Sequence, residues 1–289
     1  MVYIVLSVVC SVVVSVLLKL APRFAVDVRQ AIAGNYLVAA LLAWGVFHPD
    51  PGLLTLPVAH PAWRVLLALG VLLPTIFVVL ARAVEHVGVV RSDAAQRLSL
   101  LLSLLAAFTL FGAVLTWQKG IGMVVGLAAI GCIVARKETT AAVAKARDWL
   151  WPLGVFVGFG AIDVLFKEVA QLTGVPFTDV LFATFVLAFV LAAAGVAWLY
   201  VRGRARWRWR HAGGALLLGI FNFGDIVFYV QAHRHMAHDP ALVFSTMNIG
   251  VIVMAALVGV WLFREKLSRV NVLGIVLAVA AVLMLATAV

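Results

Sequence analysis

The hydrophobic residues of this chain gather in long runs that are separated by short polar or Pro/Gly-containing segments. Ten such runs cover approximately residues 2 to 20, 28 to 47, 63 to 83, 94 to 112, 118 to 136, 149 to 170, 177 to 201, 211 to 232, 240 to 262 and 269 to 288. Each run is close to the roughly 20 residues that an α-helix needs to cross a bilayer. The pattern predicts an all-α integral membrane protein with ten transmembrane helices.

The composition supports this prediction. Hydrophobic residues make up 65% of the 289 residues and charged residues 12%, and the mean hydropathy is +1.14. A soluble chain of this length could not bury so much apolar surface, whereas a bilayer accepts apolar helices. Cys10 and Cys132 lie inside apolar runs, so we expect neither a disulfide framework nor a metal site. No nucleotide-binding loop occurs, and we expect no cofactor.

Several segments of the first half of the chain recur in the second half. Residues 15–19 match 163–167, residues 30–36 match 179–185, and residues 110–116 match 262–268, at offsets of 148 to 152. Within the second pair, Asn35 corresponds to Thr184, and both are polar. We therefore expect a five-helix repeat over 1–136, a cytoplasmic linker over 137–148 and a second repeat over 149–289. Because five is odd, the two repeats would be inverted relative to the membrane.

The charge distribution predicts the orientation in the membrane. The net charge is +10, and basic residues favour one set of loops, which hold Arg23, Arg136, Lys137, Lys145, Arg147, Arg202, Arg204, Arg206, Arg208, Arg210, Arg264, Lys266 and Arg269. The positive-inside rule places the loops after helices 1, 3, 5, 7 and 9 in the cytoplasm and both termini outside, with the protein in the cell inner (plasma) membrane. The run from Arg202 to Arg210 is better interpreted as a headgroup anchor than as a nucleic-acid site.

These features resemble one known family. Two inverted five-helix halves, a lysine ending helices 1 and 6 (Lys19 and Lys167), and the Phe-x-Glu-x-Leu-Ser turn at 263–268 are similar to the drug/metabolite transporter superfamily, EamA-like branch. The first half departs from the pattern, because Ala113 stands where that glutamate is usual. The resemblance implies an exporter of amino acids, drugs or other small metabolites. Many such relatives are drawn with both termini cytoplasmic, which is the opposite of the charge-based orientation.

Helix 1 carries a polar stripe. Ser7, Ser11, Ser15 and Lys19 follow one another at intervals of four residues, which places them on one helical face. In hydrocarbon such a face should turn toward the bundle interior, where the hydroxyls find partners or water. The alternative is that the serines permit close helix packing and that Lys19 extends to the interface from the helix end.

Helices 6 and 8 place carboxylates inside apolar runs. Asp163 and Lys167 are one turn apart and can neutralise each other, because burying either charge alone would be costly. A functional pair at a cavity wall and a purely structural ion pair are both compatible with this spacing. Asp225 has Asn222 and Tyr229 as neighbours on helix 8. We expect it to face water, a cation or a basic partner.

Polar residues also mark the beginnings of helices 4 and 9. Helix 4 begins with Arg91, Asp93, Gln96 and Arg97, of which Asp93 and Arg97 form an i, i+4 pair. Ser245, Met247 and Asn248 occupy the corresponding place in helix 9. Either a gate or simple interfacial anchoring explains them. His233, His235 and His238 with Asp239 are interpreted as an outer loop with incidental histidines rather than as a metal cluster. If these groups titrate, transport should change between about pH 5 and 8.

The favoured function is a secondary transporter of a small organic metabolite such as an amino acid, with export the favoured direction, working by alternating access. Partners are the solute, membrane lipids and, as an open option, protons; the chain is a monomer or homodimer. The expected substrate-binding residues are Ser11, Ser15, Lys19, Asn35, Tyr36, Gln96, Arg97, Asp163, Lys167, Asn222, Asp225, Tyr229, Ser245 and Asn248. No catalytic residues are expected. A lipid-carrier flippase on the same fold is the alternative, followed by a membrane-embedded enzyme acting on lipid phosphates.

Overall fold

The structure is a computed structural model that describes the chain except residues 51–52, 54–55, 58, 88, 135–145, 207, 265–267 and 288–289. The side chains at 22, 89–91, 93, 133–134, 146–147, 263 and 286 are likewise outside the description. Most of the predicted linker at 137–148 and the glutamate of the turn at 263–268 therefore lie outside the described residues.

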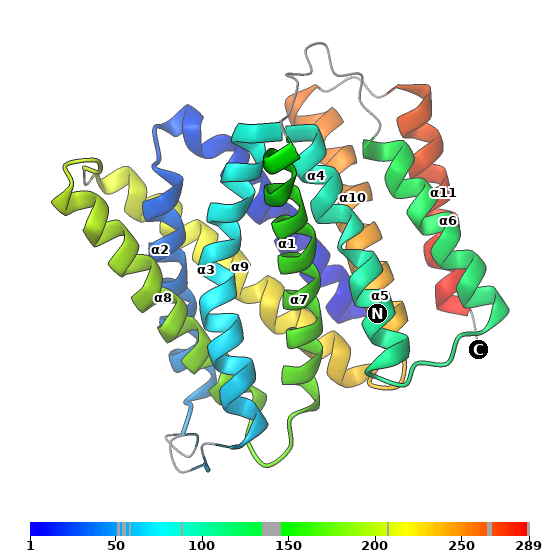
Figure 1. The fold of residues 1–289 in the computed structure, drawn as a ribbon, viewed down its shortest axis with the longest axis horizontal. Coiled ribbons are helices and arrows are strands. Elements are labelled where there is room, and N and C mark those ends of the chain that lie inside the picture. The colour runs from blue at the N-terminus through cyan, green and yellow to red at the C-terminus, as the bar shows by residue number, and fades with distance from the viewer. Residues whose placement is uncertain are drawn as a thin grey trace. The chain divides into compact units, whose positions relative to one another are not determined.

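The described residues form α-helices and contain no β-strand (Figure 1). The helices are α1 (Val2–Leu20), α2 (Val28–Phe47), α3 (Pro61–Val87), α4 (Val89–Leu98), α5 (Leu100–Thr109), α6 (Trp117–Val134), α7 (Leu150–Gln171), α8 (Phe177–Val201), α9 (Trp209–His235), α10 (Pro240–Phe263) and α11 (Arg269–Thr287). Six of the described helices, namely α1, α2, α3, α8, α9 and α10, are long and apolar enough to cross a membrane. The fold is that of an all-helical membrane protein.

The predicted apolar runs agree closely with these helices. The bounds of α1, α2 and α8 are those predicted from the sequence. The fourth run differs, because it is divided into α4 and α5 by Ser99 and begins at Val89 rather than near residue 94. The first turns of α4 contain arginine, serine and aspartate, so the apolar pattern alone does not reveal them.

The helices form two compact units, and each unit contains residues from both halves of the chain. Unit 1 consists of Met1–Val8, Ile76–Val164 and His235–Val289, and unit 2 consists of Val9–Thr75 and Leu165–Arg234. The divisions fall inside α1, α3 and α7 and before the last residue of α9. The predicted repeats at 1–136 and 149–289 remain a prediction.

In unit 1, α6 and α11 pack side by side along their length (Figure 1). A Cβ built on Gly122 would lie 3.0 Å from Cγ of Leu285, and one built on Gly126 would lie 3.6 Å from Cβ of Ala281. The contact residues rise along α6 while they fall along α11, so the two helices are antiparallel. The small residues therefore allow close packing of these two helices within one chain.

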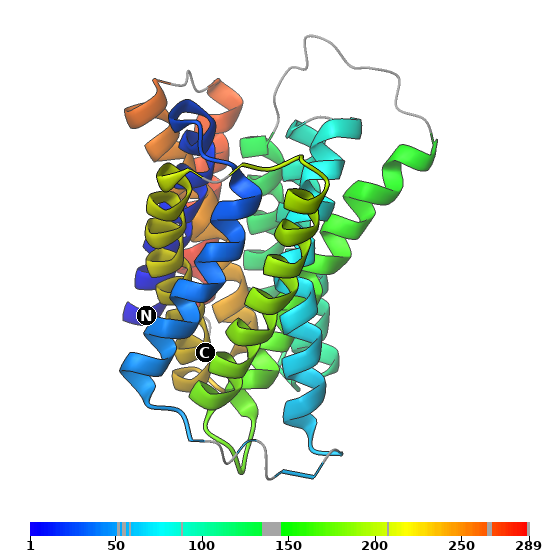
Figure 2. The same cartoon turned by 90° about the vertical axis from the view of Figure 1, so that its left-hand side faces the viewer.

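In unit 2, α2 and α8 also run antiparallel and in contact (Figure 2). The hydroxyl of Tyr200 bonds to Gln30 near the beginning of α2, and the ring of Phe47 at the end of α2 lies 6.3 Å from the ring of Phe177. Helix α9 approaches α2 closely as well. A Cβ on Gly219 would collide with Val38 of α2, so only glycine permits this approach.

Candidate functional site

A carboxylate from α7 forms the centre of a polar cluster in unit 1. Asp163 accepts a hydrogen bond of 2.8 Å at Oδ2 from the hydroxyl of Ser103 on α5. The same oxygen lies 3.4 Å from Nδ2 of Asn248 on α10, which also donates. The cluster therefore joins three helices through one ionisable group, about 20 Å along α7 from its beginning at a rise of 1.5 Å per residue.

Local structure holds each donor in place. The Asn248 amide also donates to the Phe244 carbonyl of its own helix at 3.0 Å. The Ser103 hydroxyl has one hydrogen, and its other acceptor, the Ser99 carbonyl, is 3.4 Å away, so the shorter bond to the carboxylate is favoured. A Cβ on Gly160 would lie 2.7 Å from Cβ of Leu102, which means that the glycine lets α7 approach α5 one turn before Asp163.

The structure brings together two residues that the sequence predicted, Asp163 and Asn248, and adds Ser103. Ser103 was missed because a single serine in an apolar run is usually a packing residue. Its only sequence signal is its position four residues after Ser99. Ser103 is fully buried, so its hydroxyl needs an internal partner, and the carboxylate supplies it.

The other predicted residues of unit 1 lie on α4 and α10. Gln96 and Arg97 are half-buried in the last turn of α4, directly before the interruption at Ser99. The side chains of Arg91 and Asp93 are outside the described part, so the predicted pair of Asp93 and Arg97 remains a prediction. Ser245 is buried, one turn before Asn248 on α10. Among the described atoms, its hydroxyl has no hydrogen-bond partner.

Unit 2 contains a second group of buried polar side chains. Lys167 on α7 is fully buried, and Tyr36 on α2 is 1% exposed. The Tyr36 hydroxyl donates to the Leu73 carbonyl at 2.8 Å. Asn35 and Thr184, the polar pair matched between the sequence repeats, are both buried. Within the described residues, neither the Oδ1 of Asn35 nor the hydroxyl of Thr184 has a hydrogen-bond partner.

Three of the predicted residues lie on α9. Asn222 and Asp225 are half-buried, and Tyr229 is buried. The Tyr229 ring makes edge contacts with Phe166, at 6.1 Å between centroids, and with His233, at 4.8 Å. Asp225 is near enough to Cys10 of α1 for its charge to act on the thiol. Asp225 is therefore placed beside α1, in the interior of a helix.

The interpretation of the histidines as an outer loop is wrong for His233. Helix α9 continues to His235, and His233 is completely buried within it. The apolar pattern ended the helix at residue 232 because polar residues follow, but these residues complete its last turn. The charge of Lys167 acts on the His233 ring, so the two lie in the same polar region of unit 2. Among the described residues, no group of three or more His, Cys, Asp or Glu could hold a metal ion.

The stripe of α1 is not uniformly buried. Ser7 is buried, Ser11 is half-buried, and Ser15 and Lys19 are exposed. The exposure of Lys19 near the end of α1 agrees with the alternative in which its chain extends to the interface. The contribution of Ser11, Ser15 and Lys19 to a substrate site remains a prediction.

One further ion pair connects helices in unit 1. Nζ of Lys119 in α6 lies 2.8 Å from Oδ2 of Asp239, and their side chains are 11% and 24% exposed. Asp239 also caps the N-terminus of α10, where it accepts a hydrogen bond from the backbone N–H of Leu242. The pair therefore ties the beginning of α6 to the beginning of α10.

No family model matches the chain. A protein of Haemophilus influenzae, named only as uncharacterized, is 40% identical over 279 residues, which cover 96% of this chain and 94% of the relative. The chain belongs to the family of this Haemophilus influenzae protein. The family relationship extends over nearly the whole of both proteins.

A solved crystal structure of a protein is similar in fold. It superposes with a TM-score of 0.71 at 17% sequence identity, over 99% of this chain and 98% of that one. Identity at this level establishes the fold alone. The names of the Haemophilus influenzae protein and of this structure mention no substrate. The function is therefore inferred from the site itself.

Proposed function

We propose that this protein is a secondary transporter of a small organic metabolite, such as an amino acid, with export the favoured direction. We also propose that it belongs to the drug/metabolite transporter superfamily, EamA-like branch, and that it is a multi-pass protein of the inner (plasma) membrane. The observation that carries it is Asp163, a carboxylate in the interior of α7 that accepts hydrogen bonds from Ser103 and Asn248 on two other helices.

Burying an ionisable group inside a membrane helix costs free energy, and the groups that occur there usually have a function. Asp163 is held by neutral donors from α5 and α10, which can remain in place whether the carboxyl is charged or protonated. Such a group can bind the ammonium of an amino acid or carry a proton. Lys167, fully buried one turn further along α7, is the cation proposed to attract a carboxylate.

The packing of corresponding helices supports an inverted repeat. Helices α2 and α8 have corresponding places in the two sequence halves, as do α6 and α11, and both pairs are antiparallel and in contact. Inverted repeats place corresponding helices in opposite directions across the membrane. The proposed mechanism is alternating access, in which the interruption between α4 and α5 plays the part of the broken helices found in many transporters.

The test is transport and binding by the purified protein in liposomes. Labelled amino acids, sugars and cationic drugs would be screened with and without a pH gradient, and binding of any positive solute would be repeated with Asp163→Asn and Lys167→Ala. Glu85→Gln is the matched control, because Glu85 is an exposed carboxylate that pairs with Arg82. Reduced binding in both site variants and normal binding in the control is expected. Undiminished binding in both would remove these residues from the site.

A further inference from the structure

A groove lies between α2, α8 and α9 in unit 2. It has a volume of about 380 Å³, and its walls are apolar side chains that include Leu37, Val38, Phe189 and Val196. Three polar residues, Gln30, Tyr200 and His211, line it as well. Gln30 lies at the beginning of α2, Tyr200 at the end of α8 and His211 at the beginning of α9. The groove is therefore apolar along its length and polar at one end.

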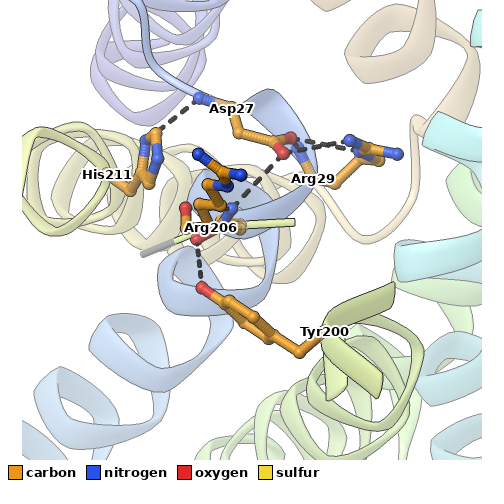
Figure 3. A network of polar contacts seen from close by, with 6 residues as sticks. Asp27, Arg29, Tyr200, Arg206 and His211 are labelled. Atoms are coloured by element: carbon orange, nitrogen blue, oxygen red, sulfur yellow. Dashed lines mark hydrogen bonds and ion pairs between the residues drawn. The ribbon is translucent and has the colours of Figure 1, made fainter. Parts of the chain in front are cut away.

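The polar end is a connected network (Figure 3). The Tyr200 hydroxyl donates to Oε1 of Gln30 at 2.7 Å, and Nε2 of Gln30 donates to the Arg206 carbonyl at 3.2 Å. The backbone N–H of Asp27 donates to Nδ1 of His211 at 3.1 Å. Since Nδ1 accepts, the ring hydrogen is on Nε2, the atom that can donate to a ligand.

The charge at this end is strongly basic. The 202–210 segment, which joins α8 to α9 and includes the first two residues of α9, carries five exposed arginines, Arg202, Arg204, Arg206, Arg208 and Arg210. The one carboxylate drawn in the network, Asp27, is already engaged by Arg29, with two side-chain bonds of 3.0 and 3.1 Å. The arginines of the segment therefore leave a net positive field at the mouth of the groove, which favours an anion.

The length of the groove fits a single leaflet. Its lining on α2 extends from Gln30 to Val38, which is about 12 Å at 1.5 Å per residue. Half of a hydrocarbon core about 30 Å thick is about 15 Å. A chain that enters at the basic end would therefore lie within the hydrocarbon of one leaflet.

We propose that this groove binds an anionic phospholipid, with one acyl chain along the apolar walls and the phosphate beside the arginines of the 202–210 segment and Nε2 of His211. Basic segments at a membrane surface attract anionic headgroups, and the apolar walls supply the chain contact that a free phosphate lacks. The lining of the groove shares no residue with the Asp163 cluster, and the lipid proposal does not depend on the transport proposal.

The full chain, reconstituted in nanodiscs or purified in mild detergent, tests this proposal by quantifying retained lipid. Phosphatidylglycerol should be retained at least tenfold over phosphatidylcholine. Ala193→Trp, which fills the groove, should abolish the preference, whereas Ala194→Trp, on an exposed neighbour outside the lining, should retain it. Val196→Phe is a second, smaller filler in case Ala193→Trp does not fold.

A second pair of variants tests the headgroup end of the groove. Arg204→Gln with Arg206→Gln should reduce the phosphatidylglycerol preference at least threefold, whereas Arg64→Gln with Arg269→Gln, which remove equal charge from exposed positions elsewhere, should leave it unchanged. Equal retention of the two lipids, or equal effects of Ala193→Trp and Ala194→Trp, would overturn the proposal. So would displacement of the lipid by millimolar inorganic phosphate, because that outcome identifies a free-phosphate site.

Discussion

Two aspartates, one in each unit, show how differently the same side chain can be used. Asp163 lies inside α7 and accepts hydrogen bonds from Ser103 and Asn248, which are 60 and 85 residues away in the sequence. Asp27 precedes α2 and accepts from the backbone and side chain of Arg29 and from Gln30, two and three residues away. One carboxylate joins distant helices, and the other organises the end of its own helix.

The donors explain the different roles. Partial burial by itself raises the pKa of the Asp27 carboxyl, but the hydrogen bonds and charge of Arg29 outweigh it and hold the pKa below its ordinary value. Asp27 is therefore ionised across the physiological range and acts as a fixed cap. At Asp163, the Ser103 hydroxyl and the Asn248 amide are neutral donors, and they can stay bonded when the carboxyl changes its charge or partner.

The largest expected effect comes from Asp163→Asn. The amide can still accept from Ser103, so the free energy of unfolding should change by less than about 1 kcal/mol. Transport in liposomes should fall at least tenfold, which corresponds to an increase of about 1.4 kcal/mol or more in the rate-limiting barrier, because the charge is gone. The control is Asp27→Asn, which should transport within about twofold of wild type. Equal losses in the two variants would end the distinction between the two carboxylates.

The next effect concerns Ser103→Ala. Removing one hydrogen bond to a charged group should lower the free energy of unfolding by about 1.5 kcal/mol. Substrate binding should weaken roughly fivefold to tenfold, because the Asp163 carboxylate is no longer held in place. Thr109→Val on the same helix is the control, because the Thr109 hydroxyl donates only within α5, to the Leu105 carbonyl, and is exposed. Titration calorimetry on detergent-purified protein measures both; weaker binding in the control as well would point to a general effect on α5.

The helices could be predicted from the sequence because lipid demands long apolar runs. The bounds of α1 and α8 follow from that demand alone. The start of α4 could not be found in this way, because its first residues are polar. Likewise the end of α9 resembles a loop in composition, although it buries His233.

The site was predictable only in part. Carboxylates such as Asp163 are conspicuous in an apolar run, but Ser103 acquires its role only when α5 and α7 approach at Gly160. The groove was missed entirely, since it depends on which residues of α2 and α8 oppose each other. The arginines at its mouth were noticed as a headgroup anchor, while the apolar walls looked like any lipid-facing surface.

A smaller effect is expected from Asp27→Asn at neutral pH. Asparagine caps a helix as well as aspartate does, so the variant removes only the interaction with Arg29, a partly exposed pair worth about 0.5 kcal/mol. Because the folded pKa of Asp27 is lowered from 3.8, this stabilisation is present above about pH 4 and is lost as pH falls through the folded pKa. The difference in unfolding free energy between the two proteins should therefore be larger at pH 7 than at pH 3. If the difference in unfolding free energy instead grows as the pH falls, the interaction with Arg29 does not stabilise the ionised Asp27.

The smallest expected effect tests whether the Asp27 network stabilises mainly its own helix end, as the short sequence separations of the bonds to the Asp27 carboxylate indicate. The Tyr200 hydroxyl is one of its long-range members, bonding to Gln30 across 170 residues, but Tyr200 is 36% exposed. Water can replace the lost partner, so a double-mutant cycle of Tyr200→Phe and Gln30→Ala should give a coupling energy of only about 0.5 kcal/mol. Chemical denaturation of the wild type, the two single variants and the double variant in detergent measures this coupling energy. A coupling above about 1.5 kcal/mol would mean that the network holds α2 and α8 together, as the Asp163 cluster joins α5, α7 and α10, and would remove the contrast between the two aspartates.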